Sequence, residues 1–249
     1  MKVLTLDEGF LVYQFDPPEG ELEGLNFLVL VEDGKALFLD TGYRENMEEA
    51  VADLADRGAV PVSAIVSHYH PDHAGGLALL GVPEVWAGEG FRKTAEPWLR
   101  PGEAIAVEPT RIVSAPTELR FGKRRLEIFP LPGHSDDSLA VVVDGAWIYA
   151  ADAILLTNDG RPVLPSVHSR PVSLHLQAVD WLAARTGLVF VPGHGAVMGE
   201  KSLRERDLAN RRRYLAALAG AKGRVSLKEA TAGCEPPFLG EAWHEENYL

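Results

Sequence analysis

Three histidines and an aspartate lie within one short segment of the chain: His68, His70, Asp72 and His73, in the order HxHxDH. In an extended loop, residues two apart point the same way, so His68 and His70 can reach one metal ion together. Pro71 then forces a turn, after which Asp72 and His73 would address a second ion. Imidazole and carboxylate ligands without thiolate suit zinc, iron or manganese.

The ordinary alternative is that these histidines have no joint role. A single histidine in a chain of 249 residues is usually a surface residue or a satisfied core residue, and one HxH pair would indicate little. Four donors this close together, drawn from 8 histidines in the whole chain, instead predict a metal site.

Short strands and amphipathic helices must position this cluster. Alternating and apolar runs predict strands at 10–15, 26–31, 36–39, 62–66, 111–114, 119–121, 125–131, 139–143, 147–150 and 188–191. Helical periodicity predicts helices at 46–57, 172–185, 200–218 and 226–232. Strands that alternate with helices twice over favour an α/β (α+β) fold in which two mixed sheets pack face to face with helices outside. We expect one domain over 1–249, with 200–249 as a C-terminal helical tail.

The composition excludes several classes of function. The formal charge of -12 would repel a duplex phosphate backbone, so nucleic acid is not an expected partner. The single cysteine, Cys234, excludes an internal disulfide framework and fits a reducing compartment. We read no export signal in the first ten residues, and no apolar run is long enough to span a bilayer. The expectation is a cytoplasmic protein that acts on a small molecule and not on a membrane.

Four further motifs complete a family resemblance. They are FLDTG at 38–42, PGHS at 132–135, AD at 151–152 and PGHG at 192–195, each predicted to stand at a strand end. Together with HxHxDH they resemble, in order, the five motifs of the metallo-β-lactamase superfamily. The resemblance covers nearly the whole chain to about Gly199 and implies a four-layer αββα sandwich.

The resemblance also implies a binuclear metal site. It assigns His68, His70 and His134 to the first ion and Asp72, His73 and His194 to the second. Asp152 would bridge the two ions and neutralise part of their charge. Asp40 would fix the metal loop by hydrogen bonds from behind the ligands. The expected cofactors are two divalent ions, zinc in the first place, with iron or manganese as alternatives.

Single positions separate the branches of the superfamily. True β-lactamases carry Cys or Ser where Asp152 stands, and flavodiiron proteins carry Glu where His70 stands. Glyoxalase II has the same ligands, but its glutathione site uses a longer helical extension than the residues left after His194. Branches that process RNA or repair DNA generally add an insert that is not recognisable here. A hydrolase of esters, thioesters or lactones remains.

The expected mechanism is hydrolysis by a metal-bridging hydroxide, with Asp72 both binding the second ion and holding the nucleophile. One alternative is a persulfide dioxygenase that uses a single iron ion on the His68, His70 and Asp152 type of site. A phosphodiesterase and a non-enzymatic metal-binding member are the others. The oligomeric state is not predicted.

Several other residues near the motifs are open to two interpretations. The segment 153–171 is predicted to be an irregular loop over the site. His168 in that loop, Tyr69 and Tyr43 are weak candidates for assisting the leaving group. His175 on the next helix is not expected to be a ligand.

Acidic and basic residues outside the motifs favour structural interpretations. Asp136 and Asp137 follow the third motif where the family commonly has Pro-Gly. They could shift the preference toward neutral or cationic substrates or cap the next turn, and we favour the turn. The arginines of the tail helix alternate with acids and are expected to form a solvated face with local ion pairs. Cys234 has no neighbouring His or Lys and is not expected to be a nucleophile.

Overall fold

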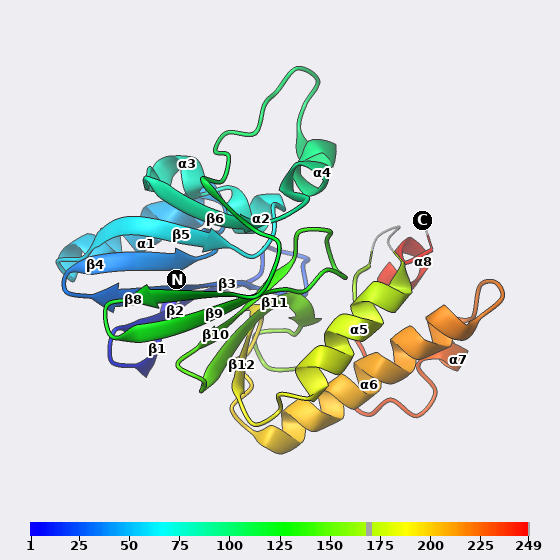
Figure 1. Cartoon of the computed structure of the whole chain (residues 1–249). Coiled ribbons are helices and arrows are strands. Elements are labelled where there is room, and N and C mark those ends of the chain that lie inside the picture. The colour runs from blue at the N-terminus through cyan, green and yellow to red at the C-terminus, as the bar shows by residue number, and fades with distance from the viewer. Residues whose placement is uncertain (168–170, 249) are drawn as a thin grey trace.

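Two sheets face each other in the computed structural model, which describes residues 1–167 and 171–248 (Figure 1). Within that part of the chain, the first sheet has seven strands: β1 (Lys2–Asp7), β2 (Phe10–Phe15), β3 (Leu25–Glu32), β4 (Lys35–Leu39), β5 (Val60–Val66), β6 (Glu84–Gly88) and β7 (Arg111–Val113). The second has five: β8 (Thr117–Phe121), β9 (Arg124–Pro130), β10 (Leu139–Val143), β11 (Trp147–Leu155) and β12 (Val189–His194).

The parallel part of each sheet sets the position of the site. The first sheet follows chain order, with β4 through β7 parallel to one another, and the second runs in the order β12-β11-β10-β9-β8. Strands β11 and β12 are also parallel. Residues after β4 and β5, and residues of β11 and β12, therefore meet at one edge of the sandwich, where carboxyl ends of parallel strands commonly carry ligand sites.

The helices lie on the two outer faces. In chain order they are α1 (Arg44–Asp56), α2 (Pro71–Ala74), α3 (Leu77–Leu80), α4 (Phe91–Ala95), the 3-10 turn η1 (Glu96–Trp98), α5 (Val172–Ala183), α6 (Lys201–Gly220), α7 (Leu227–Ala230) and α8 (Trp243–Glu246). Figure 1 shows α1 and α3 on the outer side of the seven-stranded sheet, and α5 packed along α6 beside β11 and β12.

Alternation along the strands explains the four layers. In β3, Phe27 and Val29 face the cluster that includes α1, whereas Leu28 and Leu30 face the opposite sheet. Because side chains alternate between the two faces of a strand, a strand buried on both faces must be apolar throughout. The predicted αββα sandwich of two sheets with outer helices is thus confirmed.

Most predicted elements are present within a few residues of their expected bounds. The sequence-based prediction omitted β1, a half-exposed edge strand, and β6, a strand of five residues. It was also wrong at the start of the segment 153–171, since β11 continues to Leu155 and residues Ala153 to Leu155 are buried in the sheet. The backbone remains irregular there, because Ala151 has φ 44° and the register with β12 shifts on both sides of it.

The tail helix is not the solvated face that the charge pattern predicted. Arg211 is fully buried and pairs with Asp207 through Nε and Oδ2 at 2.6 Å. Its Nη2 also donates to the Leu155 carbonyl at 2.6 Å, and its Nη1 donates to the Val163 carbonyl at 3.0 Å. Arg204 is buried as well. A face of α6 therefore holds the end of β11 and the segment after it in place.

Only arginines on the exposed side of α6 match the predicted solvated face with local ion pairs. One of them, Arg212, forms an exposed pair with Asp180 at 2.6 Å.

Across residues 1–167 and 171–248, no helix has the length and apolar character that crossing a bilayer requires.

Candidate metal centre

The HxHxDH segment leaves β5 as an extended loop and then enters one turn of helix. His68 and His70 lie in the loop, and His70 is the residue that precedes α2. Pro71 occupies the first helical position, where its missing N–H costs nothing. Asp72 and His73 follow on the helical turn, so the expected change of direction at Pro71 is confirmed.

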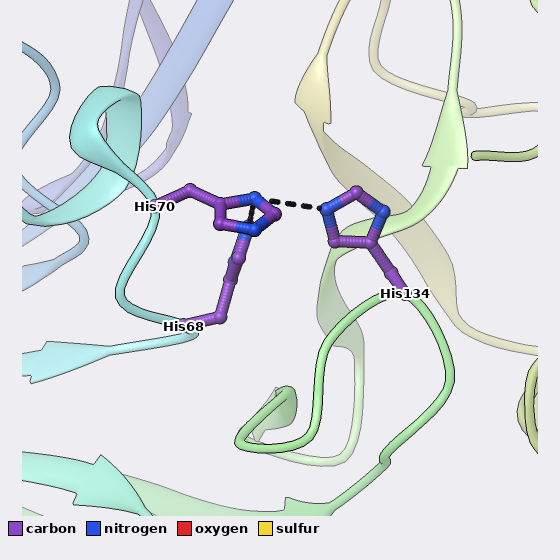
Figure 2. A group of neighbouring side chains, drawn as sticks. All are labelled: His68, His70 and His134. Atoms are coloured by element: carbon purple, nitrogen blue, oxygen red, sulfur yellow. Dashed lines mark hydrogen bonds between the residues drawn. The ribbon is translucent and has the colours of Figure 1, made fainter. Parts of the chain in front are cut away.

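Three imidazole nitrogens converge in the first group, which consists of His68, His70 and His134. His68 Nε2 lies 3.0 Å from His70 Nδ1, and His134 Nε2 lies 3.2 Å from the same atom (Figure 2). Two nitrogens bound to one tetrahedral zinc ion are about 3.3 Å apart, given the usual Zn–N bond length. The three rings therefore have the spacing of ligands around one ion.

Hydrogen bonds on the far side of two rings fix their orientation. His134 Nδ1 donates to the Ser166 carbonyl at 2.9 Å, and His68 Nδ1 lies 3.0 Å from Ser67 Oγ. Each bond turns the Nε2 atom of its ring toward the centre, as is usual for histidines that bind metal. Burial holds the pKa of His68 and His134 well below the usual range. Both rings are therefore neutral and have a lone pair to offer.

The second group consists of Asp72, His73, Asp152 and His194, whose ligand atoms lie within 4.8 Å of one another. His194 Nε2 lies 3.3 Å from Asp72 Oδ2 and 3.4 Å from Asp152 Oδ2. Burial opposes the charged form of His194, but the carboxylates of Asp152 and Asp72 outweigh it and raise its pKa to about 10. Positive charge is thus strongly favoured at this position.

Asp152, a member of the second group, also lies close to the first group. Its Oδ2 atom lies 3.5 Å from His134 Nε2 in the first group and 3.4 Å from His194 Nε2 in the second. Because one carboxylate oxygen is close to both sets of donors, Asp152 has the position of a bridging ligand. It lies inside β11 and not at a strand end as predicted, next to the left-handed residue Ala151.

Two buried polar atoms of the second group bear on whether these residues fit a metal ion. His73 Nε2 and Asp152 Oδ1 are buried and 3.2 Å apart, yet neither makes a hydrogen bond with a described residue. Buried polar groups without partners are costly and uncommon. A divalent cation would satisfy both atoms, and a donor set of imidazoles and carboxylates suits such an ion. The residues present therefore fit a divalent metal site.

Asp40 connects the metal loop to both sheets. Its carboxylate accepts hydrogen bonds from the Ser67 backbone N–H at 2.5 Å, from His73 Nδ1 at 2.6 Å and from the Tyr149 hydroxyl at 2.6 Å. Its backbone is left-handed, with φ 64°, a conformation that aspartate tolerates better than most residues. These contacts agree with the role that the family resemblance implies for Asp40, which is to fix the metal loop by hydrogen bonds from behind the ligands.

Close backbone approaches explain two of the motif glycines. A Cβ atom at Gly193 would lie 2.5 Å from Asp152 Oδ1 and 2.8 Å from His73 Cε1. A Cβ atom at Gly133 would lie 2.7 Å from the Cα atom of His175. Any side chain at either position would displace the metal site or the helix behind it.

A pocket of about 480 Å³ opens onto both groups. Its lining includes the expected His70, Asp72, His134, Asp152 and His194. The end of β11 and the segment after it contribute Leu155 and Ser166, so part of the segment 153–171 does shape the site as expected.

Sequence reasoning did not identify the remaining walls of the pocket. They are Phe15, Asp16, Pro18, Glu21, Glu23, Leu25, Glu45, Asn46, Trp98 and Trp243. No local motif marks these residues; the only signal was an acid-rich turn before β3 that contains Glu21 and Glu23. They come together because four distant segments meet above the metal groups.

The weak candidates for assisting the leaving group differ in whether they reach the pocket. Tyr43 lines the pocket, but the hydroxyl of Tyr69 donates to the Val107 carbonyl at 3.1 Å and Tyr69 is not part of the lining. His168 lies outside the described residues. His175 is buried and belongs to neither group, and burial lowers its pKa to about 4.

The acids after the third motif have structural contacts. Asp137 is buried and accepts hydrogen bonds from the Tyr69 backbone N–H at 2.9 Å and from Thr94 Oγ1 at 2.6 Å. It thereby holds the metal loop against α4. Asp136 pairs with Lys93 at 3.0 Å. Cys234 is buried, and its thiol lies 3.6 Å from the Asn210 carbonyl.

Comparison with known families gives one match over most of the chain. The family model described as the metallo-beta-lactamase superfamily matches residues 22–194, which include all seven residues of the two groups. A hydroxyacylglutathione hydrolase of Xanthomonas euvesicatoria pv. vesicatoria (strain 85-10) is 26% identical over 133 residues, 53% of this chain and 47% of that protein. One from Neisseria meningitidis serogroup A / serotype 4A (strain DSM 15465 / Z2491) is 30% identical over 99 residues, 39% of this chain and 35% of that protein. The matched stretch thus spans half or less of these relatives.

Solved structures share the fold at low sequence identity. The metallo-beta-lactamase from Pontibacter korlensis is similar with a TM-score of 0.68 and 19% identity, covering 84% of this chain and 99% of that one. The DIM-1 metallo-beta-lactamase gives a TM-score of 0.65 and 16% identity, covering 88% of this chain and 97% of that one. At these identities the similarity establishes the architecture alone.

Proposed function

Because this chain belongs to the metallo-β-lactamase superfamily, we propose that it is a binuclear metal-dependent hydrolase that cleaves an ester, thioester or lactone. The observation that carries the proposal is the position of Asp152, whose Oδ2 atom lies within 3.5 Å of a histidine from each group. Two donor sets joined by one carboxylate are the arrangement that holds two ions side by side. The curated relatives are named hydroxyacylglutathione hydrolases, which supports hydrolysis as the class of reaction.

The proposed ligands are assigned as the family motif implies. His68, His70 and His134 would hold the first ion, Asp72, His73 and His194 would hold the second, and Asp152 would contribute to both. Zinc is the proposed metal, because nitrogen and carboxylate donors with tetrahedral spacing suit it, and iron or manganese are the alternatives. The single cysteine still predicts a reducing compartment, and the proposed partner is a small-molecule substrate.

Each residue has a distinct task in this mechanism. When bound, two divalent ions lower the pKa of water to near 7 and polarise a carbonyl oxygen. Asp72, the most exposed ligand of the second group, would accept a hydrogen bond from the attacking water and orient it toward the carbonyl carbon. The Gly24 carbonyl accepts from His194 Nδ1 at 2.8 Å and keeps that ring turned toward Asp72. The leaving alkoxide or thiolate would take up the proton that the attacking water gives up and would leave through the pocket, whose wall includes Tyr43.

Metal content and a substrate panel test this proposal together. Protein purified without added metal should contain about two divalent ions per chain and should hydrolyse at least one of a set of thioesters, esters and lactones. His134→Ala should lose the first ion, whereas His244→Gln, a substitution at a buried histidine that belongs to neither group, should keep both.

Other outcomes would identify a different member of the superfamily. One tightly held iron ion and oxygen consumption with a persulfide would identify the dioxygenase alternative. Turnover of phosphodiesters alone would identify the phosphodiesterase.

A further inference from the structure

We infer that the substrate of this site carries a positively charged ammonium group, which is bound by Glu21, Glu23 and Glu45 against exposed aromatic rings at the mouth of the pocket. The inference deepens the proposed function and rests on it, because it identifies the chemical class of substrate for the same site. It is carried by the charge, the partners and the exposure of the side chains that line the pocket.

The wall of the pocket is acidic beyond the metal groups. Besides Asp72 and Asp152, four carboxylates line it, namely those of Asp16, Glu21, Glu23 and Glu45. No described lining residue is a lysine or an arginine. Asp16 accepts a hydrogen bond from Asn158 at 3.2 Å. Over residues 1–167 and 171–248, the other three carboxylates have no lysine or arginine within ion-pair distance. They are thus available to a ligand.

Bound metal does not reverse this charge. Two divalent ions would bring about four positive charges, and Asp72 and Asp152 would offset half of them. The four further carboxylates outnumber the remainder, so the pocket stays negative with both ions in place. Carboxylates around a cleft with low-dielectric walls concentrate cations and repel anions.

Two neighbouring groups in this pocket are harder to ionise than usual, mainly because they are partly buried. Burial, together with the charges of Asp72 and Glu21, raises the pKa of the Tyr43 hydroxyl to about 12. Burial is also the largest cause that raises the pKa of Glu23; the charge of His194 opposes this shift and that of Asp152 adds to it. A cation bound between these side chains would relieve both effects, because opposite charge favours the ionised form of a carboxyl group.

Aromatic rings supply the second, independent feature. Trp98 is 57% exposed and Tyr43 is 43% exposed, although both are large side chains that usually bury more of their surface. Both line the same pocket, and the ring centroid of Trp98 lies 5.5 Å from that of His70. Trp243 approaches from the C-terminal segment. Exposed aromatic faces beside carboxylates are the surroundings that bind alkylammonium groups, through cation–π attraction and charge.

The position of the cation follows from these walls. The scissile carbonyl belongs at the floor of the pocket, where Asp152 Oδ1 is buried without a hydrogen-bond partner among the described residues. The ammonium group then lies toward the turn before β3 and the start of α1, where Glu21, Glu23 and Glu45 are found. A glutathione thioester, with two carboxylates and one ammonium, has a net negative charge and is disfavoured in this pocket.

Ligand binding tests the inference without turnover. Tetramethylammonium chloride is titrated into the metal-loaded protein at constant ionic strength, with tryptophan fluorescence and calorimetry as readouts. Binding in the millimolar range is expected, and the neutral 3,3-dimethylbutanol, which has a similar shape, should bind much more weakly. The triple variant Glu21→Gln, Glu23→Gln, Glu45→Gln should weaken binding by about tenfold or more, and Trp98→Leu should weaken it less.

A matched control lies on the same turn. Glu19 is exposed and is not part of the lining, so Glu19→Gln should bind tetramethylammonium as the unchanged protein does. Circular dichroism and metal content establish that each variant is folded and loaded. If the triple variant does not fold, the three single variants replace it, and each should lose part of the affinity.

Turnover separates this inference from the proposed function. Acetylthiocholine, its neutral 3,3-dimethylbutyl analogue and an anionic S-acetyl mercaptopropionate differ mainly in charge. We expect kcat/KM to fall in that order, by about tenfold or more between the first and the last. Saturable tetramethylammonium binding without hydrolysis of any ester would contradict the proposed hydrolase function but support the ammonium-binding site. If tetramethylammonium does not bind and all three substrates turn over equally, the ammonium-binding site is contradicted and the hydrolase function is supported.

Discussion

Nδ1 of His73 lies 2.6 Å from Oδ2 of Asp40, and this contact links the metal loop to the first sheet. An ionised carboxylate can only accept, so the imidazole donates from Nδ1, and Nε2 is the ring nitrogen that faces the second group and could bind a metal ion. The His73 carbonyl accepts from the backbone N–H of Thr41 at 2.8 Å, next to Asp40 in the chain. Two adjacent residues thus fix both the backbone and the ring of one ligand.

Replacing Asp40 by asparagine should weaken metal binding while the fold persists. Asparagine tolerates the left-handed backbone at φ 64°, but it loses the charge that holds His73. We expect metal affinity to fall by about 10- to 100-fold, as measured by competition with a chelator. Asp33→Asn is the control, since Asp33 is also left-handed, with φ 48°, and lies in an exposed hairpin turn. Equal affinity of both variants would contradict this role for Asp40.

Asp72→Asn should separate chemistry from metal binding. The amide keeps an oxygen donor for the second ion but cannot hold the nucleophile as a carboxylate does. We expect kcat on the best substrate to fall by about 10²-fold or more, with only moderate loss of metal. His134→Ala should instead lose metal first and recover activity partly in excess metal. Full turnover by Asp72→Asn would show that the proposed role of Asp72 is wrong.

Arg211→Met should destabilise the protein strongly. The substitution leaves Asp207 without its partner and removes the donors to the carbonyls of Leu155 and Val163. Loss of one partner of a buried pair costs about 3–5 kcal/mol of unfolding free energy, measurable by denaturant titration. Arg212→Met, on the same helix but exposed and paired with Asp180, should change that free energy by at most about 1 kcal/mol. Similar values for the two variants would contradict the structural role of Arg211.

His175→Leu should reduce the loss of stability in acid. Burial lowers the pKa of His175 from 6.5 to about 4 in the folded protein. Between these values the unfolded chain binds a proton that the folded protein excludes, so stability falls as pH falls, by about 1.4 kcal/mol per pH unit. The difference in unfolding free energy between variant and parent should therefore shift in favour of the variant by about 2 kcal/mol from pH 7 to pH 5. Parallel pH profiles would contradict this assignment.

The metal groups could be predicted from the sequence because their information is local. The spacing of His68, His70, Asp72 and His73 depends only on the geometry of a loop and one turn. Of the remaining ligands, His134 and His194 stand beside glycines in short motifs, and Asp152 follows Ala151. The strands were predictable for a similar reason, since β10 and, apart from Gln14, β2 consist of hydrophobic residues buried on both faces. The edge strand β1 was not, because its side chains are half exposed and its pattern is weak.

The environment of those groups depended on contacts between distant parts of the chain. The charge pattern of α6 is the same whether Arg211 faces water or the end of β11, and only the packing of that helix on the sheet decides between them. The acidic and aromatic wall of the pocket likewise joins Glu21, Glu45, Trp98 and Trp243. These residues are far apart in the sequence, and no periodic pattern connects them. Local spacing determines which atoms can share an ion, because neighbouring residues are bound to the same short backbone. Burial and the electric field of a pocket are sums over the whole fold, so they follow only from the tertiary structure.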